Sequence, residues 1–171
     1  TSTGVKTATI TIMNDDPDAD EAVYTFMIQG SGETPPADVQ AAATYTVNTT
    51  ADEYDGWCSD THCSLREAVI AANYDSSDDI TINIPAGTFT LSIAGADESN
   101  GLTGDLDINN SMTIVGAGVE QTIIDANNID RALDIQVSDD FFYMSDLTVT
   151  NGYADNGGGI QIINTDFIIQ N

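Results

Sequence analysis

Asp107 and Asp134 are the two carboxylates whose spacing best suits acid–base chemistry. Each is the middle residue of a Leu-Asp-Ile triplet, 106–108 and 133–135, and the triplets begin 27 residues apart. If the triplets are neighbouring strands, the two acids stack about 4.8 Å apart. That separation is near the roughly 5–5.5 Å of retaining glycosidases and also suits a shared Ca²⁺ ion. The next triplet has Gln161 at this position, and nothing separates an acid from a base, so two solvated acids on an outer face are the favoured interpretation.

Basic side chains, which a polysaccharide lyase or hydrolase would also need, are scarce. The chain has three Lys and Arg residues and one His against 28 acidic residues. Arg131 alone lies among the strand-rich repeats, whereas Lys6 lies in an N-terminal strand and His62 is expected to be exposed. Arg66 lies in a predicted helix, where its stem is expected to pack and its head to pair with a carboxylate. Arg131, Asp107 and Asp134 are therefore weak catalytic candidates, and the sequence favours a protein that is not an enzyme.

The excess of acidic residues gives the chain a formal net charge of −25. Such a surface repels nucleic acid phosphates and anionic lipid head groups, so neither is expected as a partner. It attracts cations, above all Ca²⁺, although solubility is the simpler explanation of the charge. Asp16, Asp18 and Asp20 alternate like the first ligands of a calcium loop, but the glycine and glutamate of an EF-hand are missing. We expect no cofactor apart from Ca²⁺, for which these three acids are weak candidate ligands.

Cys58 and Cys63 are the only cysteines, with four residues between them in a hydrophilic loop. This spacing suits a disulfide in an oxidising compartment. A zinc site is the alternative, but only His62 is near and two further ligands would be needed. The disulfide is the favoured prediction.

A short amphipathic helix is predicted over residues 64–73, directly after the second cysteine. Ser64 is a good N-cap, and Glu67 three residues later completes a capping box. Leu65 and Val69 lie on one apolar stripe with two alanines. The stripe must pack against another element, and Asn73 is expected to end the helix in a left-handed conformation.

The remaining sequence predicts an all-β fold of short strands separated by Gly, Asn and Asp turns. The triplets 106–108, 133–135 and 160–162 recur every 27 residues, and Ile114, Phe141 and Ile168 follow the same spacing. A fixed period of this length predicts a parallel β-helix, whose first coil the helix would cover. A jelly roll or a β-sandwich is the alternative.

The stretch DGWCSDTHCSLREAVIAAN resembles the CSLREA-type motif of large secreted bacterial surface proteins, and the likeness covers residues 44–73. In that family the motif lies at the N-terminal edge of a right-handed, pectate-lyase-like β-helix. NGGGI at 156–160 is similar to a turn of polymorphic-outer-membrane-type β-helices. ATITIMNDD is similar to the last strand of a Calx-β-type sandwich. The resemblance implies an extracellular protein of many modules without implying an activity.

Two regions and one role follow from these observations. Residues 1–42 are expected to be two strands and a linker, as the tail of a preceding surface module or strands added to another sheet. Residues 43–171 are expected to form the capped β-helix. Because the sequence stops within a predicted strand, this region is expected to be a fragment or to end at a stacked interface. The expected role is an extracellular structural or adhesive module of a bacterial surface or matrix protein, self-associating into fibres or joining neighbouring modules. The alternative is a polysaccharide lyase or glycoside hydrolase. Polysaccharide is the other partner considered, and no membrane insertion is expected because no long apolar run occurs.

Overall fold

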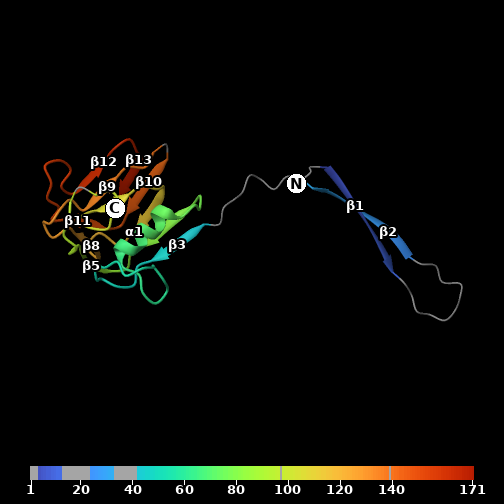
Figure 1. Cartoon of the computed structure of the whole chain (residues 1–171), viewed down its shortest axis with the longest axis horizontal. Coiled ribbons are helices and arrows are strands. Elements are labelled where there is room, and N and C mark those ends of the chain that lie inside the picture. The colour runs from blue at the N-terminus through green and yellow to red at the C-terminus, as the bar shows by residue number, and fades with distance from the viewer. Residues whose placement is uncertain (1–3, 13–23, 33–41, 97, 139) are drawn as a thin grey trace. The chain divides into compact units, whose positions relative to one another are not determined.

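The computed structural model describes residues 4–12, 24–32, 42–96, 98–138 and 140–171, with side chains from residue 42 onward. The chain divides into two compact units, Thr1–Val39 and Gln40–Asn171. The first contains strands β1 (Gly4–Ile12) and β2 (Tyr24–Gly32), which pair antiparallel with each other from Gly4↔Gly32 to Ile12↔Tyr24 (Figure 1). Among the described strands, these two form a two-stranded sheet.

Within its described residues, the second unit contains one helix, α1 (Leu65–Tyr74), and eleven short strands. β3 and β4 pair with each other, and from β4 onward consecutive strands pass to different sheets, so that strands far apart in sequence pair in parallel within each sheet. The strands are β3 (Ala43–Thr46), β4 (Ile80–Asn83), β5 (Gly87–Thr90), β6 (Leu106–Ile108), β7 (Met112–Val115), β8 (Thr122–Asp125), β9 (Leu133–Ile135), β10 (Phe141–Ser145), β11 (Thr148–Thr150), β12 (Ile160–Ile162) and β13 (Asp166–Gln170).

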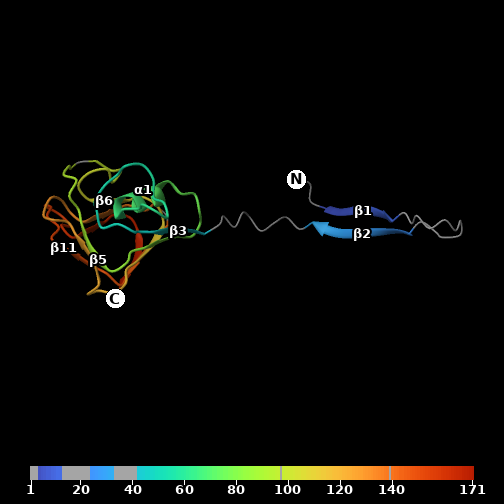
Figure 2. The same ribbon diagram turned by 90° about the horizontal axis from the view of Figure 1, so that it is seen from below.

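The described strands of the second unit form three parallel sheets. Their orders are β13-β10-β7-β4-β3, β11-β8-β5 and β12-β9-β6. Figure 2 shows α1 near β6 and β3 in this unit. The prediction of an all-β, right-handed parallel β-helix is corrected accordingly. Among the described residues, no closed solenoid is found, and one helix contributes to the core beside the sheets. The sequence period places strands in register with one another, but it does not by itself define how the sheets join.

The 27-residue spacing is correct for one sheet and wrong for another. In the β12-β9-β6 sheet, Asp107 pairs with Asp134, which pairs with Gln161, as the triplets indicate. In the largest sheet, Ile114 pairs with Met144, and Ile168 pairs with Tyr143. Phe141 is therefore not their counterpart. The turn that precedes β10, residues 136–140, is longer than the turns before β7 and β13, and it shifts the register.

The core of the second unit lies between the inner faces of the sheets and α1. Alternate residues of β4, β7 and β8 point inward, which gives each of these strands a buried, half-buried alternation. The helix contributes Leu65, Ala68, Val69 and Ala72 to this core, and it packs against β3, β4 and β6. These are the first strands of two of the sheets, so the predicted inward face of the helix covers one end of the core.

Candidate functional site

Arg66 is fully buried at the first turn of α1, where it joins the helix to two loops. Its Nε donates to Asp52 Oδ1 at 2.7 Å and its Nη2 to Asp52 Oδ2 at 3.2 Å, so the pair is bidentate. The other donors reach the carbonyl oxygens of Gly101 at 2.7 Å, Gly104 at 2.9 Å and Asp105 at 3.1 Å. This side chain is structural, and the predicted pairing with a carboxylate is present.

Asp52 is the anion at the centre of that arrangement. Besides Arg66, it accepts hydrogen bonds from the backbone N–H groups of Ser92 at 2.6 Å and Ile93 at 2.9 Å. Burial alone would raise the pKa of Asp52, but the hydrogen bonds from Arg66 and from these two N–H groups outweigh it and lower the pKa. Asp52 therefore remains ionised at neutral pH.

The weak catalytic candidates Asp107, Asp134 and Arg131 lie together, with Asp105 as a fourth member. Carboxylate oxygens of Asp105, Asp107 and Asp134 lie within 4.8 Å of one another. Arg131 Nη1 donates to Asp134 Oδ2 at 3.0 Å. Arg131 Nε lies 3.0 Å from Asp105 Oδ2, an ion-pair distance without the angle of a hydrogen bond. Gln161 Nε2 donates to Asp134 Oδ2 at 3.4 Å.

The cluster of Asp105, Asp107, Asp134 and Arg131, called here the carboxylate cluster, is not the solvated outer pair expected from the sequence. Asp105 and Asp107 are only 7% and 3% exposed. The N–H of Gly101 donates to Asp107 Oδ2 at 2.7 Å, because the loop before β6 folds over this position. Asp107 accepts a hydrogen bond from the protein backbone and Asp105 forms an ion pair with Arg131, so neither buried carboxylate is open to a sugar ring.

Burial changes the acidity of this cluster. Desolvation, with repulsion from Asp107, Asp130 and Asp134, raises the pKa of Asp105 to about 7 against the attraction of Arg131. Desolvation also raises the pKa of Asp107 to about 6, although the Gly101 hydrogen bond acts in the opposite direction. Such shifts occur at functional sites and in structural ion-pair networks alike, and the ion pairs of Arg131 with Asp105 and Asp134 form such a network here.

The raised pKa values predict that the fold gains stability as the pH falls from about 8 to about 5. In this range the folded chain binds more protons than the unfolded chain, so the free energy of unfolding decreases as the pH rises. The stabilisation is present at pH 5 and is lost as the pH rises through the pKa values of the folded state. The lowered pKa of Asp52 affects the free energy of unfolding only at pH values below the ordinary carboxyl range, so it does not change this trend. One pKa unit corresponds to about 1.4 kcal/mol, and we expect a gain of about 2 kcal/mol or more.

Urea unfolding at several pH values measures this gain. The double variant Asp105→Asn/Asp107→Asn removes both titrating groups and should flatten the profile between about pH 5 and pH 8. A parent protein that is as stable at pH 8 as at pH 5 would show that the two carboxyls do not carry raised pKa values.

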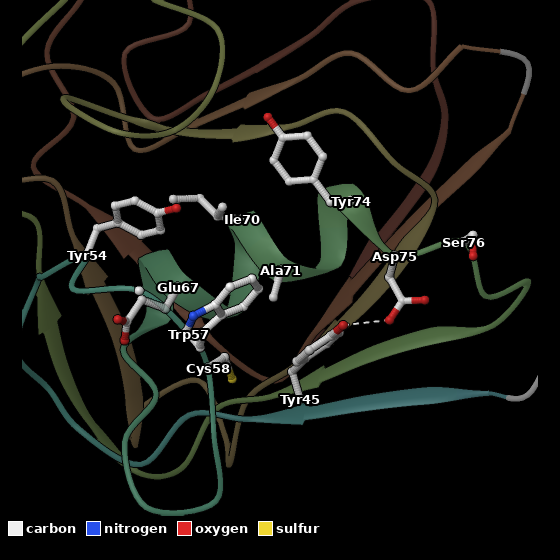
Figure 3. Close-up of a pocket in the computed structure, with 11 residues that line it drawn as sticks. Tyr45, Tyr54, Trp57, Cys58, Glu67, Ile70, Ala71, Tyr74, Asp75 and Ser76 are labelled. Carbon is white, nitrogen blue, oxygen red and sulfur yellow. Dashed lines mark hydrogen bonds between the residues drawn. The ribbon is translucent and has the colours of Figure 1, made fainter.

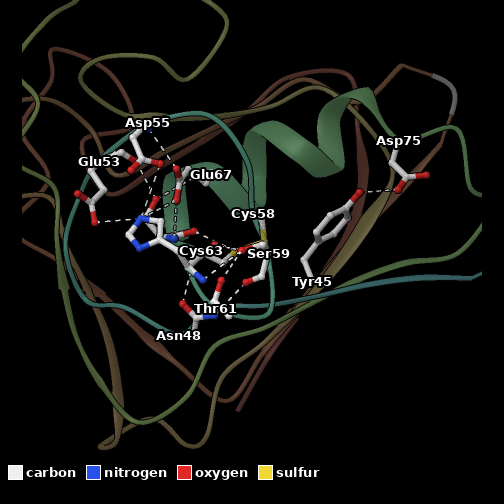
Figure 4. Close-up of a disulfide and its surroundings, with 12 residues drawn as sticks. Tyr45, Asn48, Glu53, Asp55, Cys58, Ser59, Thr61, Cys63, Glu67 and Asp75 are labelled. Carbon is white, nitrogen blue, oxygen red and sulfur yellow. Dashed lines mark hydrogen bonds and ion pairs between the residues drawn. A yellow bond between two sulfur atoms is a disulfide. The ribbon is translucent and has the colours of Figure 1, made fainter.

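Cys58 and Cys63 form a disulfide in the loop that leads into α1 (Figure 4). The side-chain oxygen of Asn48 accepts from the N–H of Cys63 at 2.7 Å, and the N–H of Asn48 donates to the Cys63 carbonyl at 3.0 Å. These bonds hold the loop against the segment that follows β3, and the Ser59↔His62 bridge closes the loop on itself.

His62 lies in the disulfide loop, opposite three carboxylates near the N-terminus of α1. Its Nε2 is 3.2 Å from Glu53 Oε1, 3.5 Å from Glu67 Oε2 and 3.9 Å from Asp55 Oδ1. None of these pairs has the geometry of a hydrogen bond. His62 with Asp55 and Glu67 has ligand atoms close enough to share a metal ion, but Glu67 is already used in a cap.

The predicted capping box of α1 is present. The Ser64 hydroxyl accepts from the Glu67 N–H at 3.1 Å, and Glu67 Oε2 accepts from the Ser64 N–H at 2.9 Å. Burial would raise the pKa of Glu67, but the N–H groups of Ser64 and Asp55 outweigh it and lower the pKa. The predicted helix end is wrong: α1 continues to Tyr74, and an extended Asp75 caps it.

Asn73 therefore has a different role from the one predicted. Its side chain donates to the Asp107 carbonyl at 2.7 Å and accepts from the Asn109 N–H at 2.9 Å. The side chain of Asn110 in turn donates to the carbonyls of Ala72 at 3.0 Å and Asp75 at 2.8 Å. Residues from the β6–β7 turn thus complete the C-terminal end of the helix.

A pocket of about 610 Å³ lies over the outward face of α1 (Figure 3). Four aromatic side chains surround this face: Tyr45 from β3, Tyr54 and Trp57 from the disulfide loop region, and Tyr74 from the end of the helix. We call this space the aromatic pocket. Its other lining residues are Gly56, Cys58, Glu67, Ile70, Ala71, Asp75 and Ser76.

The rings of the aromatic pocket are largely open to solvent. Trp57 is 87% exposed, Tyr74 78% and Tyr54 47%. Tyr45 donates its phenolic hydrogen to Asp75 Oδ2 at 2.5 Å. Burial and this bond to Asp75 raise the pKa of Tyr45 to about 12, and hydrogen bonds from Ser77 and Tyr45 lower the pKa of Asp75. At neutral pH the tyrosine is therefore protonated and the carboxylate charged.

The aromatic pocket was not predicted from the sequence, although aromatic residues are concentrated near the predicted helix. The single Trp and three of the six Tyr residues fall within residues 45–74, around the predicted helix. Asp105 was also missed, because its partner Arg131 is distant in the sequence. The candidate calcium ligands Asp16, Asp18 and Asp20 lie outside the described residues.

Comparison with known proteins gives no match to a family model, to a curated protein or to a solved structure. Among the described residues, no helix is long and apolar enough to cross a membrane.

Proposed function

We propose that the chain is a structural and adhesive module of an extracellular bacterial surface or matrix protein, which joins a neighbouring module or a second copy through its open sheet edge. The observation that carries this proposal is β13, at the edge of the largest sheet. All five of its residues are exposed, including Phe167 at 49%, Ile168 at 47% and Ile169 at 41%. An edge strand with free backbone groups and apolar side chains is a template for pairing with another strand.

The engagement of the cationic groups also supports a structural role. Arg66 bonds Asp52 and three carbonyls, and Arg131 pairs with Asp105 and Asp134. The burial of Asp105 and Asp107 gives little support to the lyase or hydrolase alternative, because a catalyst needs such groups at a substrate. The disulfide is compatible with an oxidising, extracellular compartment.

Ca²⁺ fits this proposal as the cation that reduces repulsion between charged copies. With a net charge of −25, two chains repel each other unless salt or a divalent ion screens the charge. Assembly is therefore expected to strengthen when Ca²⁺ is added, and EDTA is expected to reverse the effect.

Ile168→Lys is expected to weaken assembly of the chain, because a charged residue on an edge strand opposes pairing. The measurement is the molar mass by light scattering over rising protein concentration, at about 0.15 M salt where surface repulsion is partly screened. Val119→Lys is the matched control, since it adds the same charge to an exposed apolar position in a turn. A parent chain that remains monomeric at every concentration, with and without Ca²⁺, would contradict self-assembly through this edge.

A further inference from the structure

The aromatic pocket combines ring faces with negative charge, and this combination limits the ligands that it suits. Trp57, Tyr54 and Tyr74 are exposed in one place on the surface, and gathered exposed apolar groups mark interaction sites. The pocket volume of about 610 Å³ lies in the range of roughly 300–1,000 Å³ of pockets that hold small ligands. A ligand with flat, weakly polar faces can cover several of these rings at once.

The charge of the aromatic pocket favours a cation. Asp75 and Glu67 line it, and both have lowered pKa values, so both are ionised at neutral pH. Aromatic faces attract a cation through the ring quadrupole, most strongly at Trp. The net charge of −25 adds a long-range attraction for a polycation. Among the described residues, no Lys or Arg lines the pocket to supply that charge from within.

The walls of the pocket favour a sugar over a peptide. An extended peptide gains affinity by bonding its backbone to a free strand edge. Here the floor is the outward face of α1, with Ile70 and Ala71, and the backbone groups of a helix interior are bonded within the helix. A sugar ring needs no such partner, since its C–H face can lie on an aromatic ring while its hydroxyls stay in water or reach Tyr45 and Asp75.

We propose that the aromatic pocket binds a polysaccharide of amino sugars with free ammonium groups, with sugar faces against Trp57 and Tyr74 and an ammonium near Asp75. This inference names a ligand for the proposed adhesive role, and it rests on the proposed extracellular location. It does not use the β13 edge, so the assembly experiment and the binding experiment can fail separately.

A glucosamine trimer is the probe, at about pH 6 where an amine of this kind carries its proton. Trp57 is the only Trp in the chain, so its fluorescence reports binding directly, and calorimetry gives the affinity where Trp57 is replaced. We expect the trimer to change the Trp57 emission at low salt, and the affinity to fall as salt rises.

Substitutions in the aromatic pocket should weaken this binding without unfolding the chain. Trp57→Ala and Asp75→Asn are each expected to lower the affinity at least about tenfold, while the melting temperature shows that the fold is kept. Tyr153→Ala is the control, because Tyr153 is a 72% exposed aromatic residue outside the pocket lining. Equal losses in the control and in Trp57→Ala would overturn the proposal.

Two further ligands separate charge from sugar. The N-acetylated trimer has the same rings without the charge, and trilysine has the charge without the rings. We expect each to bind at least about tenfold more weakly than the glucosamine trimer. Equal binding of the acetylated trimer would make this a site for neutral glycans. Equal binding of trilysine would make it a site for basic peptides, and no binding of the glucosamine trimer would end the proposal.

Discussion

Replacing Arg66 by alanine is expected to lower the free energy of unfolding by about 3–5 kcal/mol, the loss typical when one partner of a buried ion pair is removed. The variant leaves the Asp52 carboxylate without its bidentate partner. It also leaves the carbonyls of Gly101, Gly104 and Asp105 without the donors that Arg66 supplied. Urea unfolding followed by circular dichroism measures the loss.

Two variants test the reason for this effect. Arg66→Lys keeps the charge but has neither the planar fork nor enough donors for all four acceptor residues, so it should recover only part of the loss. Arg131→Ala removes a side chain that is 19% exposed and should cost less than Arg66→Ala. If Arg66→Ala unfolds within about 1 kcal/mol of the parent, the contacts of Arg66 do not stabilise the fold as we infer.

Arg66 shows how far sequence reasoning reaches at this site. Its place in a capped helix next to the cysteines predicts a structural role and a carboxylate partner, because an arginine on a packed helix face needs both. The identity of the partner does not follow. Asp52 lies 14 residues before it, and the accepting carbonyls lie 35 to 39 residues after it, in a loop without a recognisable pattern.

The triplet around Asp107 shows a second limit. The period predicts that Asp107 and Asp134 are neighbours, and they pair directly. The period does not predict the exposure of Asp107, because exposure depends on which residues fold over the strand. The N–H of Gly101 and the side chain of Asn73 contact Asp107, and neither contact leaves a periodic trace in the sequence. The same reason explains the register shift before β10, since turn length is not part of the repeat.

The helix and its disulfide loop were the most predictable part of the chain. Capping residues and an apolar stripe act within one turn or two of helix, so Ser64, Glu67 and Leu65 can be recognised locally. The aromatic pocket on the opposite face needs Tyr45 from β3 and Trp57 from the loop to meet over the helix. Only the packing of α1 against β3, β4 and β6 brings these rings together.

Leu65→Asp is expected to destabilise the second unit by about 3 kcal/mol or more, so that a large part of the chain unfolds or aggregates. Leu65 is 3% exposed and belongs to the core. The variant loses the packing of a buried leucine, about 2–5 kcal/mol for truncation alone, and it places a carboxylate where no water reaches it. Natural domains have only about 5–15 kcal/mol to lose.

The position of Leu65 separates two effects of the aspartate on stability. Its interaction with the helix dipole stabilises the helix, whereas its burial in the core destabilises the fold. An aspartate in the first turn of a helix is favourable by about 0.3–1 kcal/mol through the helix dipole. A helix that did not pack against the sheets would therefore become slightly more stable. Ala71→Asp is the control on the same helix, since Ala71 lines the outward pocket, and it should cost much less. Thermal and urea unfolding of both variants measure the difference, and a Leu65→Asp protein as stable as the parent would show that α1 does not cover the core.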